Sequence, residues 1–379
     1  MQHVKLGQTC LTDAPAAARD FHQQVAQPGM GLVLFFCSSH YDLPALAEAM
    51  VTCFGDVPVI GCTTAGELGP QGYQDNSLSG ASFPADSFFA SSLCIQDLKK
   101  TKLNQIQRQT RDLEARHKDS KAETFTNSFA LLLVDGVSQC EDALTRVIHN
   151  TMPTMPLLGG SAGDDLDFRQ TLVFHQGEFH RDSAVLVLLS TSCPVAAIKS
   201  QHFAATDQRL VVTGAAPHKR LVTEINGLPA ASEYARLTGV DEKDLNLMRF
   251  ASSPVVVMIN GKEYVRSIQQ ANPDGSLTFY SAIEEGLVFR VAHGVDLLNN
   301  LTTSLQQACA DIGKPQVLLA FDCVLRKLEL EQTGDKPQAS ELIKQYRTIG
   351  FNSYGEQYSG VHVNQTFTGM AIGSPTGDL

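Results

Sequence analysis

The chain has 379 residues, of which 43% are hydrophobic and 18% charged, and its formal net charge is −11 with a pI of about 5.4. This composition is typical of folded domains, the length predicts two of them, and the negative charge argues against nucleic acid as a partner. No run approaches the roughly 18 apolar residues of a membrane span, so we expect a cytoplasmic protein without membrane insertion.

Nine cysteines are scattered from Cys10 to Cys323, and none of them forms a C-x-x-C pair. Several lie in apolar runs, such as Cys37 and Cys94, where a reduced thiol behaves as a small hydrophobic side chain. We therefore expect neither a disulfide framework nor a structural zinc site.

Three segments share one plan. In each, a continuous apolar run predicts a buried strand, an amphipathic stretch predicts a helix, and a second apolar run leads into a glycine-rich polar turn. The strand-like runs are 32–36, 131–134 and 317–321, and the helices are expected at 43–53, 141–150 and 339–346. Strands that alternate with helices predict parallel pairing.

The three glycine-rich turns are expected to follow the carboxyl ends of strands, where ligands bind in open α/β sheets. Their glycines would let a backbone approach a ligand, and their hydroxyl, amide and carboxylate groups would orient it. A tight turn with close strand packing is the alternative. The predicted ligand-binding residues, together with one arginine near the third unit, are Gly61, Thr63, Thr64, Glu67, Gly159, Gly160, Ser161, Asp164, Arg326, Asn352, Ser353 and Glu356.

The intervening segments have other patterns. Residues 99–127 are polar and charged, which predicts a solvated helix and a loop. Residues 171–190 predict a hairpin that turns near Gln176-Gly177, followed by a buried strand. Residues 254–291 predict an antiparallel meander of four short strands, with turns at Asn260-Gly261 and Asp274-Gly275.

The fold class that follows is a two-part α/β protein, with repeated strand-helix-strand units on a mainly parallel sheet and an antiparallel meander in the C-terminal part. We place the first domain at 1–213, with two of the repeated units. The second domain, 214–379, contains the meander and the third unit.

Four stretches in this order resemble the FIST family of intracellular sensory proteins: GCTTAGELGPQGY, PLLGGSAGDDLDF with TLVFHQGEF, LVTEINGLPAASEY, and IGFNSYGEQYSGVHVNQTF. The resemblance covers residues 30 to 373 and implies a FIST N-terminal domain and a FIST C-terminal domain. A separate chain of this length resembles the NosP group of that family. That resemblance implies bacterial signal transduction without catalysis, haem b as cofactor, nitric oxide as signal, and regulation of a sensor histidine kinase or of a diguanylate cyclase or phosphodiesterase. A small amino-acid-like metabolite is the alternative ligand.

Haem requires an axial ligand beside an apolar pocket. The histidine candidates are His202, His218 and His362, and a buried cysteine thiolate or the phenolate of Tyr354 could also bind iron. The chain has no C-x-x-C-H, so covalent attachment is excluded. Composition permits haem without requiring it.

An enzyme is the other class to consider, because residues 159–163 match G-x-S-x-G, the turn that presents the serine nucleophile of α/β-hydrolases. That mechanism needs a helix after Ser161, whereas the sequence there predicts a loop and a hairpin. Its acid and base would be Asp182 or Asp207 with His218, and nothing in their spacing favours one pairing. We therefore expect a protein that is not an enzyme.

The sequence leaves alternative roles for two acidic clusters and for two arginines. The acidic clusters Asp164-Asp165 with Asp167, and Glu284-Glu285, could hold a divalent ion or be solvated loop carboxylates. Arg266 and Arg326 could pair with a carboxylate such as Glu67 or Glu356, or fix an anionic group of a ligand, for example a haem propionate.

Overall fold

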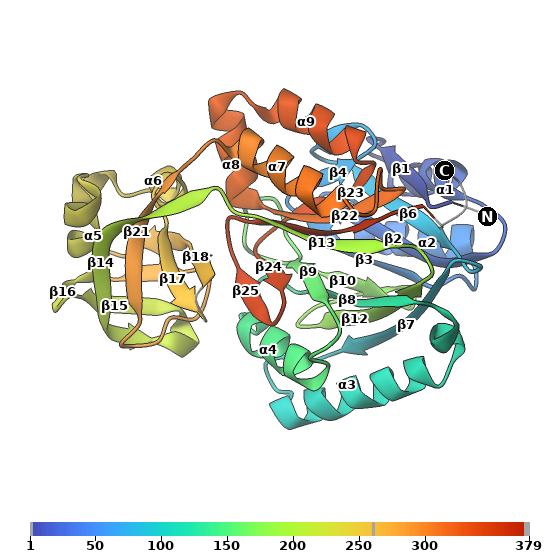
Figure 1. Cartoon of the computed structure of the whole chain (residues 1–379), viewed down its shortest axis with the longest axis horizontal. Helices are drawn as coiled ribbons and strands as arrows, with labels where there is room; N and C mark the ends of the chain where they lie inside the picture. The colour runs from blue at the N-terminus through green and yellow to red at the C-terminus, as the bar shows by residue number, and fades with distance from the viewer. Residues whose placement is uncertain (1–2, 260–261, 375–379) are drawn as a thin grey trace.

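The structure is a computed structural model that describes residues 3–259 and 262–374. It has a larger body, built from three sheets with helices outside them, and a smaller body formed by residues 203–294 (Figure 1). The chain leaves the larger body after β13, builds the smaller body, and returns to the larger body at α7. Residue 213 lies within β14, the first strand of the smaller body.

The first sheet has the order β1-β6-β2-β3-β10-β11. Its strands are β1 (Lys5–Thr9), β2 (Met30–Ser38), β3 (Val59–Thr64), β6 (Leu78–Pro84), β10 (Val173–His175) and β11 (Glu178–His180). Helices α1 (Ala14–Val25) and α2 (Leu43–Phe54) pack on its outer face through a shared apolar cluster. Both helices begin in the same way, with an aspartate N-cap, Asp13 or Asp42, and a proline in the first turn.

The second sheet has the order β25-β24-β9-β8-β12-β7. Its strands are β7 (Phe88–Ile95), β8 (Asn127–Val134), β9 (Leu157–Ser161), β12 (Ala184–Thr191), β24 (Glu356–Tyr358) and β25 (Val361–Val363). Helices α3 (Leu103–Lys118) and α4 (Glu141–Thr151) cover it, and the short helix η1 (Lys121–Thr124) follows α3. The helix and loop expected in residues 99–127 are confirmed, as are the hairpin at Gln176-Gly177 and the buried strand after it.

The third sheet has the order β13-β26-β22-β23-β4-β5. Its strands are β4 (Glu67–Gly69), β5 (Gly72–Gln74), β13 (Val195–Ser200), β22 (Val317–Cys323), β23 (Thr348–Ser353) and β26 (Phe367–Ile372). Helices α7 (Leu297–Cys309), α8 (Val324–Thr333) and α9 (Lys336–Gln345) pack against it.

Each of these sheets contains one parallel pair, β2/β3, β8/β9 or β22/β23, and each pair is connected through one or two helices. The other neighbouring strands in these sheets pair antiparallel, so the expectation of a mainly parallel sheet is wrong and the sheets are mixed. In each sheet one short hairpin follows the parallel pair, and the next strand, β6, β12 or β26, then pairs antiparallel with the first strand of that pair.

The three sheets exchange hairpins in a cycle. The β4-β5 hairpin follows β3 but pairs with β23 of the third sheet. The β24-β25 hairpin follows β23 but pairs with β9 of the second sheet, and β10-β11 follows β9 but pairs with β3 of the first. The inner faces of all three sheets meet in one apolar core, in which Phe36, Phe321 and Phe351 contact one another. The ends of β3, β9 and β23 are thereby held close together.

The smaller body is an antiparallel sheet of order β18-β17-β21-β14-β15-β20-β19, with β16 paired to β15. Its elements are β14 (Phe203–Ala216), η2 (Pro217–Lys219), β15 (Leu221–Ile225), β16 (Leu228–Pro229), α5 (Ala230–Thr238), η3 (Glu242–Asp244), α6 (Leu247–Ser252), β17 (Val255–Ile259), β18 (Lys262–Arg266), β19 (Ile268–Ala271), β20 (Leu277–Phe279) and β21 (Val288–Gly294).

The antiparallel pairing expected in residues 254–291 is confirmed, but the strand order is not that of a meander, because β21 lies between β17 and β14. The turn expected at Asp274-Gly275 is present, and Gly275 has the positive φ that such a turn requires. The turn expected at Asn260-Gly261 lies outside the described residues.

Candidate functional site

The glycines expected in ligand-binding turns lie instead within strands. Gly61 is in β3, Gly159 in β9 and Gly350 in β23, and each faces the backbone of its parallel neighbour. A Cβ at these positions would lie 2.3 Å from the Phe35 carbonyl oxygen, 1.9 Å from that of Leu132 and 1.8 Å from that of Ala320. Close strand packing therefore accounts for these three glycines.

The loops that follow these strands meet one another through backbone hydrogen bonds. The Ala65 amide donates to the Asn352 carbonyl at 3.0 Å, and the Ser161 amide donates to the Gly355 carbonyl at 2.8 Å. The Gly163 amide donates to the Thr63 carbonyl at 3.0 Å, which completes the contacts among the three loops. The structure thus brings together predicted residues from all three units.

Two buried glutamates brace these loops in the same way. The Glu67 carboxyl accepts from the hydroxyl of Thr64, three residues before it, and from the amide and hydroxyl of Ser77, ten residues after it. The Glu356 carboxyl accepts from the hydroxyl of Ser353 and from the amide and hydroxyl of Thr366, at the same spacings. Burial raises the pKa of Glu67 to about 7 and that of Glu356 to about 8. These glutamates hold the loops in place.

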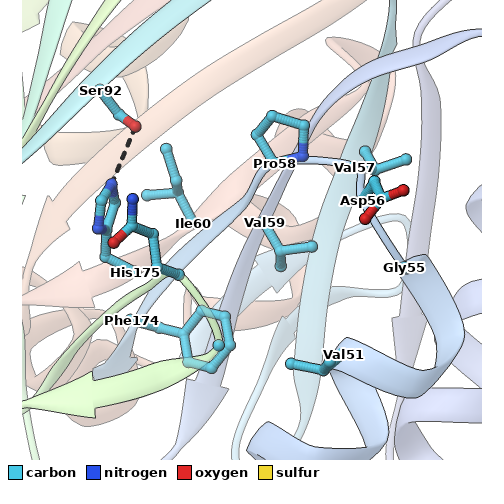
Figure 2. A pocket seen from close by; sticks show the side chains of 12 residues that line it. Val51, Gly55, Asp56, Val57, Pro58, Val59, Ile60, Ser92, Phe174 and His175 are labelled. Atoms are coloured by element: carbon cyan, nitrogen blue, oxygen red, sulfur yellow. Dashed lines mark hydrogen bonds between the residues drawn. The ribbon is translucent and has the colours of Figure 1, made fainter.

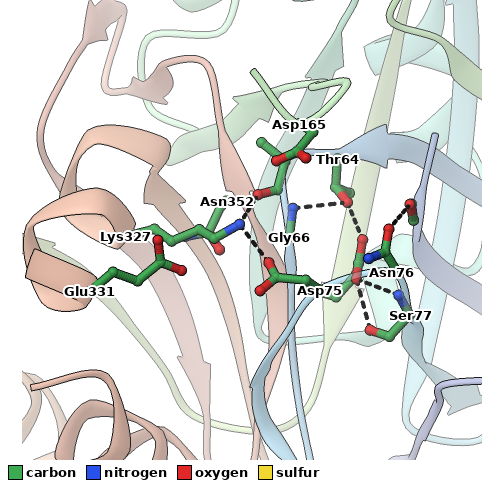
Figure 3. A network of polar contacts seen from close by, with 12 residues as sticks. Thr64, Gly66, Asp75, Asn76, Ser77, Asp165, Lys327, Glu331 and Asn352 are labelled. Atoms are coloured by element: carbon green, nitrogen blue, oxygen red, sulfur yellow. Dashed lines mark hydrogen bonds and ion pairs between the residues drawn. The ribbon is translucent and has the colours of Figure 1, made fainter. Parts of the chain in front are cut away.

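The space beside Gly66 is filled by a polar network that includes Lys327 from the third unit (Figure 3). The Lys327 ammonium donates to the Ala65 carbonyl at 2.9 Å and pairs with Asp75 at 2.5 Å. A Cβ on Gly66 would lie 2.8 Å from the side-chain oxygen of Asn352. The loops therefore converge on a packed polar centre, and none of the twelve predicted ligand-binding residues lines the cavities described below.

The two arginines pair differently from the expectation. Arg326 forms a fully buried ion pair with Asp322 at 2.7 Å and contacts Nδ1 of His202 at 2.8 Å. Arg266 donates to the His362 carbonyl at 3.1 Å. Neither pairs with Glu67 or Glu356, because those carboxyls are already bonded to hydroxyl and amide groups of their own loops.

A small polar cavity lies where the loops face the smaller body. Its volume is about 200 Å³, and its lining residues are Gly136, Val137, Gln139, Glu141, Phe168, Arg220, Gln269, Thr278, Phe279, Tyr280 and Tyr354. One wall follows the carboxyl ends of β8, β9 and β23, and the other belongs to the smaller body. We call this cavity the interbody cleft. Its place matches the position at which open α/β sheets bind ligands.

Aromatic side chains on the larger body form one wall of the interbody cleft. Phe168 stacks on Tyr354 with ring centroids 4.4 Å apart and lies 6.0 Å from the ring of Tyr280. The Tyr354 hydroxyl donates to the Asp164 carboxylate, which also accepts from the amides of residues 168–170. Asp164 therefore fixes both aromatic rings without lining the cleft itself.

Charged side chains cross from one body to the other at the same cleft. Arg220 of the smaller body pairs with Glu141 at the start of α4, and its guanidinium lies 3.7 Å from the Asp142 carboxylate. Burial raises the pKa of Glu141, although Arg220 opposes that change. Arg220 has a φ of +54°, an uncommon value for a residue with a side chain. These contacts attach the smaller body to the larger one.

One residue that lines the cleft, Tyr280, has an unpaired hydroxyl among the described residues. Tyr280 is 6% exposed, and its Oη makes no hydrogen bond to any residue that the structure describes. An unpaired buried hydroxyl costs roughly 1–3 kcal/mol, so such a group marks a place where a ligand or water can bond.

The sequence did not reveal Arg220, Glu141, Phe168 or Tyr280 as site residues. One signal was available: Gly136 follows the buried run of β8, and a Cβ there would lie 2.1 Å from the Ala162 carbonyl oxygen. A glycine two residues after the first strand of the unit thus marks the loop that lines the cleft.

The three predicted axial histidines do not fit haem. Both ring nitrogens of His202 are bonded, to Arg326 and to Glu329, and His218 is exposed on η2. His362 is buried, with its pKa lowered to about 4 by burial, and it lines none of the cavities described here.

The other ligand types expected for haem iron are also unsuited. Burial and the bonded Asp164 raise the pKa of Tyr354, which favours the neutral phenol over the phenolate. Burial raises the thiol pKa of Cys37, Cys62 and Cys323 well above the ordinary value, which disfavours a thiolate. The residues named from the sequence therefore do not form a haem site.

A different histidine borders a larger cavity of about 360 Å³ between α2, the start of β3 and the β10-β11 hairpin (Figure 2). His175 lies in its wall with apolar neighbours such as Ile60 and Phe174, and its Nε2 is 3.0 Å from the Ser92 hydroxyl. Burial lowers the pKa of His175, which favours the neutral imidazole that metals bind.

Ser161 lacks the surroundings of a hydrolase nucleophile. It is fully buried at the end of β9, and its hydroxyl accepts from the Gln357 amide. A loop and then the hairpin strand β10 follow it, as expected from the sequence, so no helix dipole stabilises charge there. Among the described residues, no group of three or more histidine, cysteine, aspartate or glutamate side chains is arranged to hold a metal ion.

In the part of the chain that the structure describes, no helix is both long and apolar enough to span a bilayer.

The family model described as the FIST N domain matches residues 31–228, and the model described as the FIST C domain matches residues 230–359. No curated protein matches the chain. A crystal structure of cyanuric acid hydrolase from A. caulinodans is similar over 99% of this chain and 100% of its own, with 8% identity and a TM-score of 0.40, which is too slight a likeness to support an argument.

Proposed function

The chain belongs to the FIST family of sensory signal-transduction domains, and on that premise we propose that it senses a small polar metabolite bound in the interbody cleft. The observation that carries the proposal is the unpaired Tyr280 hydroxyl in a cavity of about 200 Å³ that also contains Arg220 and Glu141. Pockets for drug-sized ligands measure roughly 300–1,000 Å³, so the ligand has to be smaller, with about ten non-hydrogen atoms.

The charges of the cleft favour an amino-acid-like ligand. A carboxylate of the ligand would bond to the Arg220 guanidinium, and an ammonium group would bond to Glu141. Phe168 and Tyr354 offer aromatic surface to an apolar or cationic side chain. The Tyr280 hydroxyl would supply a further hydrogen bond.

Binding there would change how the two bodies sit together. Arg220 and the Ala282 amide both reach across to α4, where the amide donates to Asp142 at 3.3 Å. A ligand that competes for Glu141 or Arg220 interacts differently with the closed and open arrangements, and such a difference is what a population shift requires. The partner that reads this change is, in this proposal, a sensor histidine kinase or a diguanylate cyclase or phosphodiesterase in the cytoplasm. All nine cysteines are free, which suits that reducing compartment.

The test is a screen of the twenty amino acids and small dicarboxylic acids by thermal shift, followed by calorimetry on any compound that stabilises the protein. We expect one chemical class to bind and the Tyr280→Phe variant to bind it about fivefold to tenfold more weakly, since one hydrogen bond is lost. Tyr346→Phe, directly after the end of α9, is the matched control and should bind normally. If no compound binds, or if both variants bind equally well, the interbody cleft is not the sensing site.

Haem-based sensing of nitric oxide is the second candidate, and the specific observation for it is His175. Haem b, when bound, would supply the metal that takes up nitric oxide, and Nε2 of His175 would be available to hold it after releasing Ser92. Protein produced with haem supply should then show a Soret band that shifts with nitric oxide. His175→Ala should remove the band, whereas His180→Ala should keep it. A colourless protein would contradict this second candidate.

A further inference from the structure

A second cavity, of about 450 Å³, lies at the opposite end of β23 from the interbody cleft. It is lined by His3, Val4, Lys5, Leu6, Gln24, Pro70, Lys344 and Arg347. These residues come from the edge strand β1, from α1, from the β4-β5 turn and from the end of α9. We call it the basic cavity.

The charge of the basic cavity opposes that of the whole chain. Among the described residues its lining includes Lys5, Lys344 and Arg347 and no carboxylate, whereas the chain has a net charge of −11. Two acids contact lining residues: Glu341 pairs with Lys344 at 2.7 Å, and Asp20 accepts from Gln24 at 3.0 Å. Glu341 is itself largely exposed, with 68% of its side chain accessible, so it neutralises Lys344 weakly.

Arg347 is held in place by the backbone around it. Its Nε donates to the Gln316 carbonyl at 2.8 Å, and Nη2 lies 3.4 Å from the Val4 carbonyl. Arg347 also has a φ of +53°, in the left-handed region that side-chain-bearing residues rarely occupy. A guanidinium fixed in this way is ready to bond an anion without losing further side-chain freedom.

We propose that the basic cavity binds a small polyanion that carries at least two linked phosphate groups. Three cations from two segments, Lys5 of β1 and both Lys344 and Arg347 at the end of α9, surround one hollow, so a ligand with several adjacent negative charges can contact them together, which a single phosphate cannot do. Lysine ammonium groups and a fixed guanidinium are the donors that proteins use for phosphate oxygens. The bound ligand would connect β1 to the end of α9, two segments that are more than 300 residues apart.

Calorimetry with inorganic pyrophosphate at low salt tests the proposal. We expect pyrophosphate to bind more tightly than orthophosphate and more weakly as sodium chloride rises, because screening weakens charge contacts. The double variant Lys5→Gln/Lys344→Gln should bind pyrophosphate about tenfold more weakly. Both side chains are at least partly exposed, so this variant should fold normally.

The matched control is Lys100→Gln/Lys243→Gln, which removes the same charge from two exposed, ion-paired lysines elsewhere. It should bind pyrophosphate as the unmodified protein does. Equal weakening in both double variants, no heat of binding, or tighter binding of citrate than of pyrophosphate would overturn the proposal. Tyr280→Phe should leave pyrophosphate binding unchanged, so the outcome here is independent of the sensing role of the interbody cleft.

Discussion

At the scale of single residues, Glu67 and Glu356 make stability depend on pH. In the unfolded chain both titrate near 4.5, but burial raises their folded pKa to about 7 and about 8. Between those values the folded protein holds protons that the unfolded chain releases. The free energy of unfolding therefore falls by roughly 1.4 kcal/mol per pH unit for each group, from about pH 4.5 up to about 7 for Glu67 and up to about 8 for Glu356.

Glu67→Gln and Glu356→Gln should each reduce this dependence, because the amide keeps hydrogen bonds to the neighbouring hydroxyls and does not ionise. Urea unfolding at pH 5, 6.5 and 8 measures how the free energy of unfolding depends on pH. The double variant should show the smallest change of this free energy with pH. The exposed Glu341→Gln serves as control and should keep the slope of the unmodified protein. Identical slopes in all proteins would show that the two glutamates are not protonated in the fold.

Arg220 and Glu141 predict a second residue-level effect. Arg220→Met leaves the Glu141 carboxyl buried without its partner, which typically costs about 3–5 kcal/mol. Adding Glu141→Gln to the same chain should recover much of that loss, since no buried charge then remains. Denaturant unfolding of the single and double variants measures the recovery, and a double variant no more stable than Arg220→Met would contradict the pairing. Lys100→Met, which removes an exposed pair with Asp97, should change stability little.

At the scale of elements, the central strands depend on glycine. Gly350→Ala should destabilise the protein by about 2–4 kcal/mol, because the new Cβ would lie 1.8 Å from the Ala320 carbonyl oxygen. Gly294→Ala is the control, since its Cβ would meet nothing nearer than 3.7 Å. Thermal unfolding of both variants compares them. Equal stability would mean that β22 and β23 can separate without cost.

The sequence predicted the strands of the three units and one helix in each, because each unit combines a buried apolar run with an amphipathic stretch, but it missed the second helix of the third unit, α8. It misassigned the glycine-rich segments, because glycine, threonine and serine are also frequent in turns, whereas here Gly61, Gly159 and Gly350 allow two backbones to approach. The hairpin exchange could not be predicted, since pairing between distant segments leaves no periodic pattern.

At the scale of the molecule, the loops that follow β3, β9 and β23 do contact one another, and they surround a packed polar centre. The interbody cleft beside them could not be predicted from one sequence, because its lining comes from segments between residues 136 and 354. Asp164, which was predicted from the sequence, links these loops to the cleft. It bonds to the Tyr354 hydroxyl and to the Phe168 amide, and so fixes both aromatic residues in the cleft wall. The division at residue 213 stays a prediction.

The two bodies are connected by two chain crossings, near His202 and near Val295, whose amide donates to the His202 carbonyl at 2.7 Å. Arg326 and Glu329 of α8 hold the His202 ring from both sides. The two crossings are therefore fixed to each other and to α8, and they act together as one hinge. Because the hinge is fixed, we expect motion of the smaller body to be concentrated at the interbody cleft.

The central claim is that a ligand in the interbody cleft alters how the two bodies contact each other. Hydrogen–deuterium exchange tests it most directly, with and without whichever amino acid or dicarboxylic acid stabilises the protein in the thermal screen. We predict changed exchange in residues 136–141, 217–221 and 277–282, on both sides of the cleft, and unchanged exchange in the core strands β2 and β8. Changes confined to residues 51–60 and 174–177, around His175, or changes on one body alone, would contradict the claim.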